Sequence, residues 1–124
     1  MKNIDKYLRV LQEQFDARIA LEDVSGDFKD EWTDCYEVRC HRQFENKYEK
    51  NICKDDCRMR SAMKALSRIS SAKVKCNGAP EPNRCVNTLE NGILRYKKML
   101  QRFKESQLKA QAKMREFQAK GGGT

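Results

Sequence analysis

A seam of core-type residues runs from Val86 to Phe117, recurring at alternating spacings of three and four without a slip. In a helix with 3.6 residues per turn, these spacings keep all ten positions on one face. The repeat therefore predicts one continuous helix over residues 86–119, on the order of 50 Å long. Gly92 weakens its first turns by about 1 kcal/mol relative to alanine, which predicts a late start. In coiled-coil terms the a positions are Val86, Ile93, Leu100, Gln107 and Met114, and the d positions are Leu89, Tyr96, Phe103, Ala110 and Phe117.

The rest of the chain is also typical of long helices. Its 124 residues are 39% hydrophobic and 35% charged, a balance that amphipathic helices tolerate and buried sheets do not. Turn signals are scarce, because both prolines lie between residues 76 and 85 and three of the six glycines lie in the last four residues. The sequence therefore predicts an all-α fold with one domain over residues 1–120 and a glycine-rich tail over 121–124.

Three further helices are expected, over residues 2–24, 28–50 and 54–74. The apolar residues of the first helix lie on one face. Ser25-Gly26-Asp27 is expected to end this helix, with Asp27 as the N-cap of the second. In the second helix an aromatic residue or cysteine recurs every four residues, and the chain is expected to turn between Glu45 and Lys50. The apolar positions of the first helix are Ile4, Leu8, Leu11, Phe15 and Ile19; those of the second are Phe28, Trp32, Tyr36, Cys40, Phe44 and Tyr48.

Six cysteines are expected to form three disulfides. If 28–50 and 54–74 form an antiparallel hairpin, residues that lie opposite each other have residue numbers with the same sum. The numbers of Cys35 and Cys57 sum to 92 and those of Cys40 and Cys53 sum to 93, so both pairs can lie opposite each other in one hairpin. Cys76 and Cys85 would close the proline-containing loop between the last two helices. The predicted fold is therefore a disulfide-stapled antiparallel helical hairpin, with an N-terminal helix and a long C-terminal coiled-coil-like helix.

The spacing of Cys35 and Cys40 conflicts with pairing both of them to the third helix. Cys35 and Cys40 are five residues apart, about 140° around an α-helix, so a straight helix cannot point both at one neighbour. Either the helix is distorted there, or Cys35 pairs elsewhere, for instance with Cys76 or Cys85. The cysteines could also be free thiols or the ligands of a four-thiolate zinc site, with His41 as a substitute ligand. No C-x-x-C is present, so disulfides are preferred and no metal or cofactor is expected.

The cysteine pattern resembles the stapled helical hairpins of small mitochondrial intermembrane-space proteins. The resemblance covers about 25 residues and implies oxidation without a signal peptide. It departs from that family in spacing, because those hairpins use three or nine intervening residues in both halves and the first half here has four.

Charge divides the chain. Residues 1–60 carry a net charge of −2 and residues 61–124 a net charge of +10. The long helix carries Lys97 and Lys104 at e positions and Lys113 at a g position, which disfavours a parallel pair of copies. An antiparallel seam with the acidic first helix, or with an acidic partner, removes that repulsion.

The C-terminal third of the long helix is expected to bind another subunit. The first helix is too short to cover the whole seam, so Gln107, Ala110, Met114 and Phe117 are the predicted partner-binding residues, with Lys97, Lys104 and Lys113 beside them. Met114 and Phe117 are expected to be buried there.

Nucleic acid is a second possible partner of the long helix. Basic residues on the faces outside the seam would contact its phosphates. These residues are Arg95, Lys98, Arg102, Lys109 and Arg115.

The function expected from these features is non-enzymatic. One histidine and no phosphate loop, nucleophile elbow or spaced carboxylate pair leave no basis for a catalytic mechanism. The prediction is a structural or adaptor subunit of a large assembly, foremost a virion component of a phage tail, neck or baseplate. Such a component is made without a signal peptide and oxidised after release. The runners-up are a subunit of a mitochondrial intermembrane-space complex, a secreted protein, and a basic zinc-containing nucleic-acid-binding protein. No membrane insertion is expected.

Overall fold

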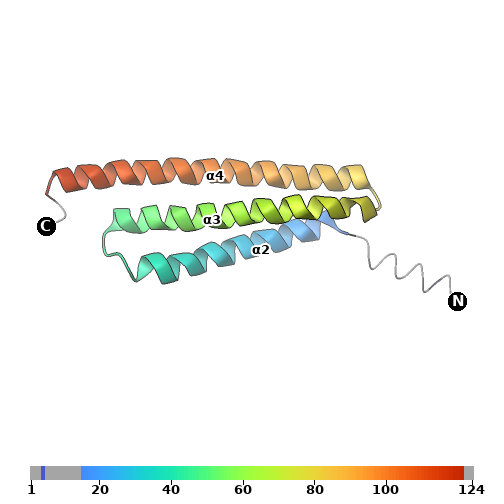
Figure 1. Cartoon of the computed structure of the whole chain (residues 1–124), viewed down its shortest axis with the longest axis horizontal. Coiled ribbons are helices and arrows are strands. Elements are labelled where there is room, and N and C mark those ends of the chain that lie inside the picture. The colour runs from blue at the N-terminus through green and yellow to red at the C-terminus, as the bar shows by residue number, and fades with distance from the viewer. Residues whose placement is uncertain (1–3, 5–14, 122–124) are drawn as a thin grey trace.

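In the part of the chain that the structure describes, three long helices form a bundle in which the middle helix contacts both others (Figure 1). The structure, a computed structural model, describes Ile4 and residues 15–121. Helix α2 (Ala17–Cys35) continues into a π-helix (Tyr36–His41), and a short turn leads to α3 (Lys47–Lys73). A 3-10 helix (Val74–Gly78) then leads to α4 (Pro82–Ala119). The all-α prediction is confirmed, and neighbouring helices run antiparallel (Figure 1).

The predicted break at Ser25-Gly26-Asp27 is wrong. Helix α2 passes through this tripeptide, and its N-cap is Asp16, whose side chain accepts a hydrogen bond from the Arg18 backbone N–H at 2.9 Å. The apolar spacing of Ala17, Leu21, Val24 and Phe28 continues across the tripeptide, so packing outweighs the local turn signal. Of the apolar stripe predicted for residues 2–24, Leu8 and Leu11 lie outside the described residues.

The other predicted boundaries also differ, by seven to nine residues around the turn before α3. The turn after the second helix comes earlier than expected, because Asn46 caps α3 by accepting from the backbone N–H groups of Tyr48 and Glu49. Helix α3 therefore begins at Lys47 rather than Lys54. Helix α4 begins at Pro82, whose missing N–H costs nothing in the first turn, and Gly92 does not delay it.

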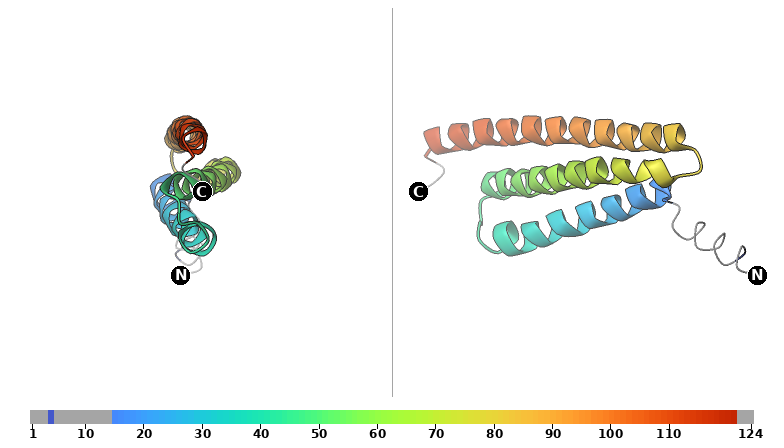
Figure 2. Two further views of the ribbon diagram at one scale, coloured as in Figure 1. Left: turned by 90° about the vertical axis from the view of Figure 1, so that its left-hand side faces the viewer. Right: turned by 45° about the vertical axis from the view of Figure 1, so that its right-hand side comes forward.

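The apolar core lies where all three helices meet. Ile69, Leu89, Ala62 and Ala65 are fully buried. Gly92 lets α2 approach α4, since a Cβ there would come within 2.6 Å of the Leu21 side chain and 3.6 Å of Ile69. We call this region, defined by Leu21, Ile69 and Gly92, the convergent end. From here α2 diverges from α4 toward Cys35 (Figures 1 and 2).

Aromatic and charged side chains fill the space where the helices begin to separate. The Phe28 and Tyr96 rings form a T-shaped pair with centroids 5.4 Å apart, and the Phe28 ring stacks on Phe103 at 6.3 Å. The Arg58 guanidinium lies 4.6 Å from the Trp32 ring centroid and 5.5 Å from that of Phe103. It also lies 3.6 Å from the carboxylate of Asp55, which is only 2% exposed. This cluster joins all three helices at mid-length.

Polar contacts fix α2 against α3. The Ser61 hydroxyl donates to the Phe28 carbonyl at 2.8 Å, and the Arg68 guanidinium donates to the Glu31 carboxylate. The hydrogen bond to Glu31 raises the pKa of Arg68 above its ordinary value. Asp27, expected to be an N-cap, instead lies 3.9 Å from Arg68. Among the described residues, no helix has the length and apolar character needed to cross a membrane.

Candidate functional site

Two disulfides join the C-terminal end of α2 and the π-helix to α3. Cys35 bonds to Cys57, with 5.7 Å between Cα atoms, and Cys40 bonds to Cys53, with 5.6 Å. Both pairings are the predicted ones, and both separations are typical of disulfides. We call the region defined by these four cysteines the stapled end.

The π-helix explains how Cys35 and Cys40 both reach α3. Backbone hydrogen bonds in a π-helix join residues five apart, so residues i and i+5 come round to about the same face. Cys35 and Cys40 are five apart, with Cys35 directly before the π-helix and Cys40 within it, whereas Cys53 and Cys57 are four apart on regular α-helix. Of the two explanations left open by the spacing, helix distortion is therefore the one that the structure contains.

The sulfur atoms of the stapled end form one cluster. The Cys40 and Cys57 sulfurs, which belong to different disulfides, lie 3.8 Å apart. Cys40 and Cys57 are buried, while Cys35 and Cys53 are partly exposed. The sulfurs of Cys40, Cys53 and Cys57 all lie within 4.8 Å of one another. The two staples are thus adjacent rather than independent.

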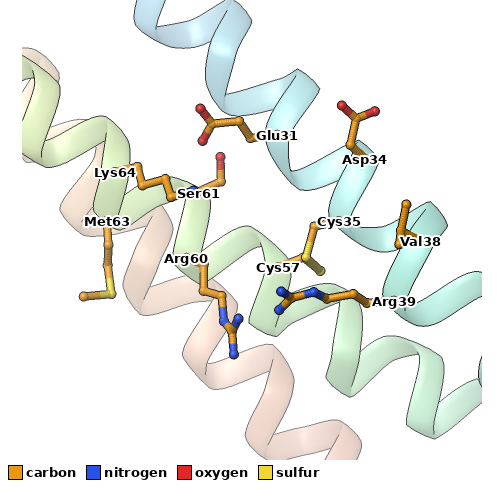
Figure 3. Close-up of a pocket in the computed structure, with 10 residues that line it drawn as sticks. All are labelled: Glu31, Asp34, Cys35, Val38, Arg39, Cys57, Arg60, Ser61, Met63 and Lys64. Atoms are coloured by element: carbon orange, nitrogen blue, oxygen red, sulfur yellow. A yellow bond between two sulfur atoms is a disulfide. The ribbon is translucent and has the colours of Figure 1, made fainter.

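An open groove of about 570 Å³ runs beside this cluster, between α2 and α3 (Figure 3). The Cys35–Cys57 disulfide bridges the two helices in this groove, with the exposed Val38 near it and the exposed Met63 at the other end. Charged side chains line the groove from both helices: Glu31, Asp34, Arg39, Arg60 and Lys64. The groove therefore gives solvent access to one of the two staples.

The third disulfide lies at the opposite end of the bundle. Cys76, in the 3-10 helix, bonds to Cys85 in the first turn of α4, with 5.5 Å between Cα atoms. Both cysteines are buried. This pairing was also predicted, and among the described residues no cysteine is left free.

The predicted partner-binding residues face α3 within the same chain. Gln107 donates its side-chain N–H to the Ile52 carbonyl at 3.1 Å, Ala110 is buried, and the Phe117 ring lies 5.8 Å from that of Tyr48. Met114 is half-buried. Among the described residues, α3 covers this part of the seam, whereas the sequence suggested the acidic first helix or an acidic partner. Binding of a partner by these four residues stays a prediction.

The basic residues of α4 lie outside the seam. Lys97, Lys104 and Lys113 are exposed, as are the five residues predicted to contact phosphates: Arg95, Lys98, Arg102, Lys109 and Arg115. Leu94 and Leu108, 51% and 55% exposed, lie among them. We call the surface formed by these two leucines with Arg95, Lys98, Arg102, Lys109 and Arg115 the outer face of α4.

Sequence reasoning missed several of these features. The groove, the contact at Gly92 and the position of Arg58 between two rings depend on how the helices approach one another. A signal did exist for the link between Arg68 and α2, because Asp27 and Glu31 are four residues apart and share a helical face.

No family model matches the chain, and comparison with the curated proteins and with the solved structures found no match.

Proposed function

We propose that the protein is a non-enzymatic structural or adaptor subunit of a larger assembly, and that the outer face of α4 docks on an acidic protein surface. The observation that carries this proposal is the separation of charge between helices. Helix α2 has two basic and six acidic residues, a net charge of −4, whereas α4 has nine basic and three acidic residues, a net charge of +6. Such a distribution steers association with an acidic partner.

Exposed leucines favour a protein partner over nucleic acid. Leu94 and Leu108 are fourteen residues apart, about 21 Å along the helix, with basic side chains around them. A phosphate backbone neutralises the cations but offers nothing apolar to cover two leucines. A protein surface with apolar and acidic groups can cover the leucines and pair with the basic residues, as the apolar cores and polar rims of interfaces generally do.

An oxidising setting suits the three disulfides. Disulfides persist outside the reducing cytosol, and they stabilise small helical proteins whose cores are thin. A virion that must survive outside a cell is the setting we favour. The mitochondrial intermembrane space and the extracellular space are the alternatives, and the same proposal of docking through α4 applies in each.

The test is to follow the chain by size in an extract of its native source. We expect the wild-type chain to elute at the mass of an assembly, and the Leu94→Ser/Leu108→Ser and Arg95→Glu/Arg102→Glu variants to elute as monomers. Val74→Ser and Lys29→Glu are the matched controls, since each changes an exposed residue of the same kind elsewhere. A wild-type chain that elutes as a monomer, or control variants that are released as well, would contradict the proposal.

The alternative function is nucleic-acid binding through the five basic residues of the outer face. Fluorescence anisotropy with a DNA duplex over a range of salt concentrations distinguishes it. Contacts to several phosphates give a steep fall of log K with log salt concentration, with a slope of roughly −0.9 per phosphate. We expect a slope near zero at physiological salt, and nuclease treatment of the extract should leave the assembly intact.

A further inference from the structure

We propose that the four cysteines of the stapled end form a zinc-binding site when both disulfides are reduced. This inference concerns a second state of the same cysteines and does not depend on the proposed docking function. In the oxidised state the sulfurs of Cys40, Cys53 and Cys57 already lie within 4.8 Å of one another. After reduction, rotations of a few cysteine side chains would be enough to form a metal site.

The distance between the two staples matches tetrahedral thiolate coordination. With a zinc–sulfur bond of about 2.3 Å, two ligands of a tetrahedral site are about 3.8 Å apart. The Cys40 and Cys57 sulfurs have this separation, 3.8 Å, without any bond between them. Reduction leaves this pair in place and requires only that the two bonded pairs, Cys35 with Cys57 and Cys40 with Cys53, separate by rotation of their side chains.

Cys35 supplies the fourth ligand. Its sulfur is bonded to that of Cys57, so it begins within reach of the same centre. The π-helix directs Cys35 and Cys40 to one face, and the i, i+4 spacing does the same for Cys53 and Cys57 on α3. Two ligands from each of two adjacent segments surround one ion.

The surroundings suit a tetrathiolate site. A zinc ion with four thiolates carries a net charge of −2, and the Arg39 side chain extends toward the Cys35–Cys57 disulfide (Figure 3). Arg60, which is paired with Asp56, and Lys64 lie farther along the groove, and Glu31 and Asp34 line it as well. The Arg39 guanidinium would offset part of the negative charge of the site. The groove also gives a reductant and a metal ion a path to the cluster, while burial of Cys40 and Cys57 excludes water from the other side.

The chemistry balances with a dithiol as reductant. Two dithiol molecules transfer four electrons and four protons to the two disulfides, which become four thiols, and each dithiol becomes a disulfide. Binding of Zn²⁺ by the four thiolates then releases four protons. In reverse, two molecules of hydrogen peroxide take four electrons from the thiolates and four protons from the solvent. The two disulfides form again, four water molecules are made and Zn²⁺ leaves.

A reduced protein needs such a replacement link at this end. Apolar packing among all three helices is concentrated at the convergent end, and α2 diverges from α4 toward Cys35 (Figure 2). Structural zinc contributes folding free energy directly. The same four cysteines therefore tie α2 to α3 in either redox state.

The experiment is a titration of the full-length protein with Co²⁺ after reduction by a phosphine without oxygen. We expect one Co²⁺ per chain, with thiolate-to-cobalt charge-transfer bands and the intense visible bands of tetrahedral cobalt, and displacement by one equivalent of Zn²⁺. Zn²⁺ should raise the Tm of the reduced protein and leave that of the oxidised protein unchanged.

Variants separate this site from binding by loose thiols. Cys76→Ser/Cys85→Ser should keep the spectrum, Cys40→Ser should weaken Co²⁺ binding by more than roughly tenfold, and Cys35→Ser should change the spectrum to that of three thiolates. His41→Ala should have no effect. A weak octahedral spectrum, or loss of the tetrahedral bands in Cys76→Ser/Cys85→Ser, would overturn the proposal. Circular dichroism covers the case in which the reduced protein unfolds, since failure of Zn²⁺ to restore helicity also overturns it.

Discussion

The two ends of the bundle hold their helices together by different means. At the convergent end, Leu21, Ile69 and Gly92 bring three helices into apolar contact, and one buried disulfide closes the loop between α3 and α4. At the stapled end, α2 diverges from α4, and two adjacent disulfides join α2 to α3 (Figure 1). Two disulfides are thus present where α2 and α4 no longer pack on each other.

This difference follows from the size and composition of the chain. Burial of apolar surface stabilises by about 25 cal/mol per Å², and a polar chain of this length has little such surface to spare. The apolar side chains are concentrated around Ile69 and Leu89, so the other end depends on cross-links that restrict the unfolded chain. The contrast between the ends can be tested by substitutions at each of them.

Removal of both staples should have the largest effect. Replacing Cys35, Cys40, Cys53 and Cys57 with serine should lower the free energy of unfolding by about 5 kcal/mol, from the entropy of the two nested loops. Cys76→Ser/Cys85→Ser should cost about 2.5 kcal/mol, because one short loop is released. Urea denaturation of the three proteins measures both values. Equal losses would show that the stapled end depends on its disulfides no more than the convergent end does.

A larger side chain at the convergent end comes next. Gly92→Val should lower the free energy of unfolding by about 2 kcal/mol, since the new side chain would overlap the end of the Leu21 side chain and displace it from its packing against α4. Gly26→Val is the matched control, because no atom lies within 4 Å of a Cβ at that position. If both variants unfold at the same denaturant concentration, Gly92 does not set the approach of the helices.

The tip of α4 should contribute less. Phe117→Ser should cost about 1.5 kcal/mol, roughly half the cost of truncating a fully buried phenylalanine, because the ring is half-buried against Tyr48. Thermal unfolding of the purified protein gives this value, and size measurement in native extract shows whether assembly is also lost. A variant with unchanged stability that fails to assemble would support the prediction that this tip binds another subunit.

Gly26→Ala should have the smallest effect, and it should be stabilising. The position is exposed in the interior of α2 with free space around it, so alanine gains helix propensity of about 0.5 to 1 kcal/mol without a clash. Calorimetry should show a small rise in Tm. A fall would mean that the backbone near Gly26 needs the freedom of glycine.

Much of the architecture could be predicted because it follows from local periodicity. The alternation from Val86 to Phe117 predicted the end of α4 and placed its start four residues too late, and the cysteine spacings predicted the three disulfides. The break at Ser25-Gly26-Asp27 was wrong because a turn signal worth about 1 kcal/mol competes with a continuous apolar face.

The remaining features depend on contacts distant in sequence. No periodicity assigns the seam of α4 to α3 rather than to the first helix, since both offer an apolar stripe. The groove beside Cys35, and the position of Arg58 between Trp32 and Phe103, arise only when the helices take their places. The π-helix was hidden for a related reason, because reasoning from 3.6 residues per turn treats every helix as regular.

The widened turn at Tyr36–His41 can also be understood as a single inserted residue. An α-helix that gains one residue between two fixed points takes up the surplus as one π-turn. Deleting one exposed residue, Glu37, would give Cys35 and the second cysteine the same spacing that Cys53 and Cys57 have on α3. The shortened helix would still present both sulfurs to their partners. We therefore expect this segment to lose one residue without loss of the cross-links, because the π-turn already takes up a one-residue difference between the two pairs of cysteines.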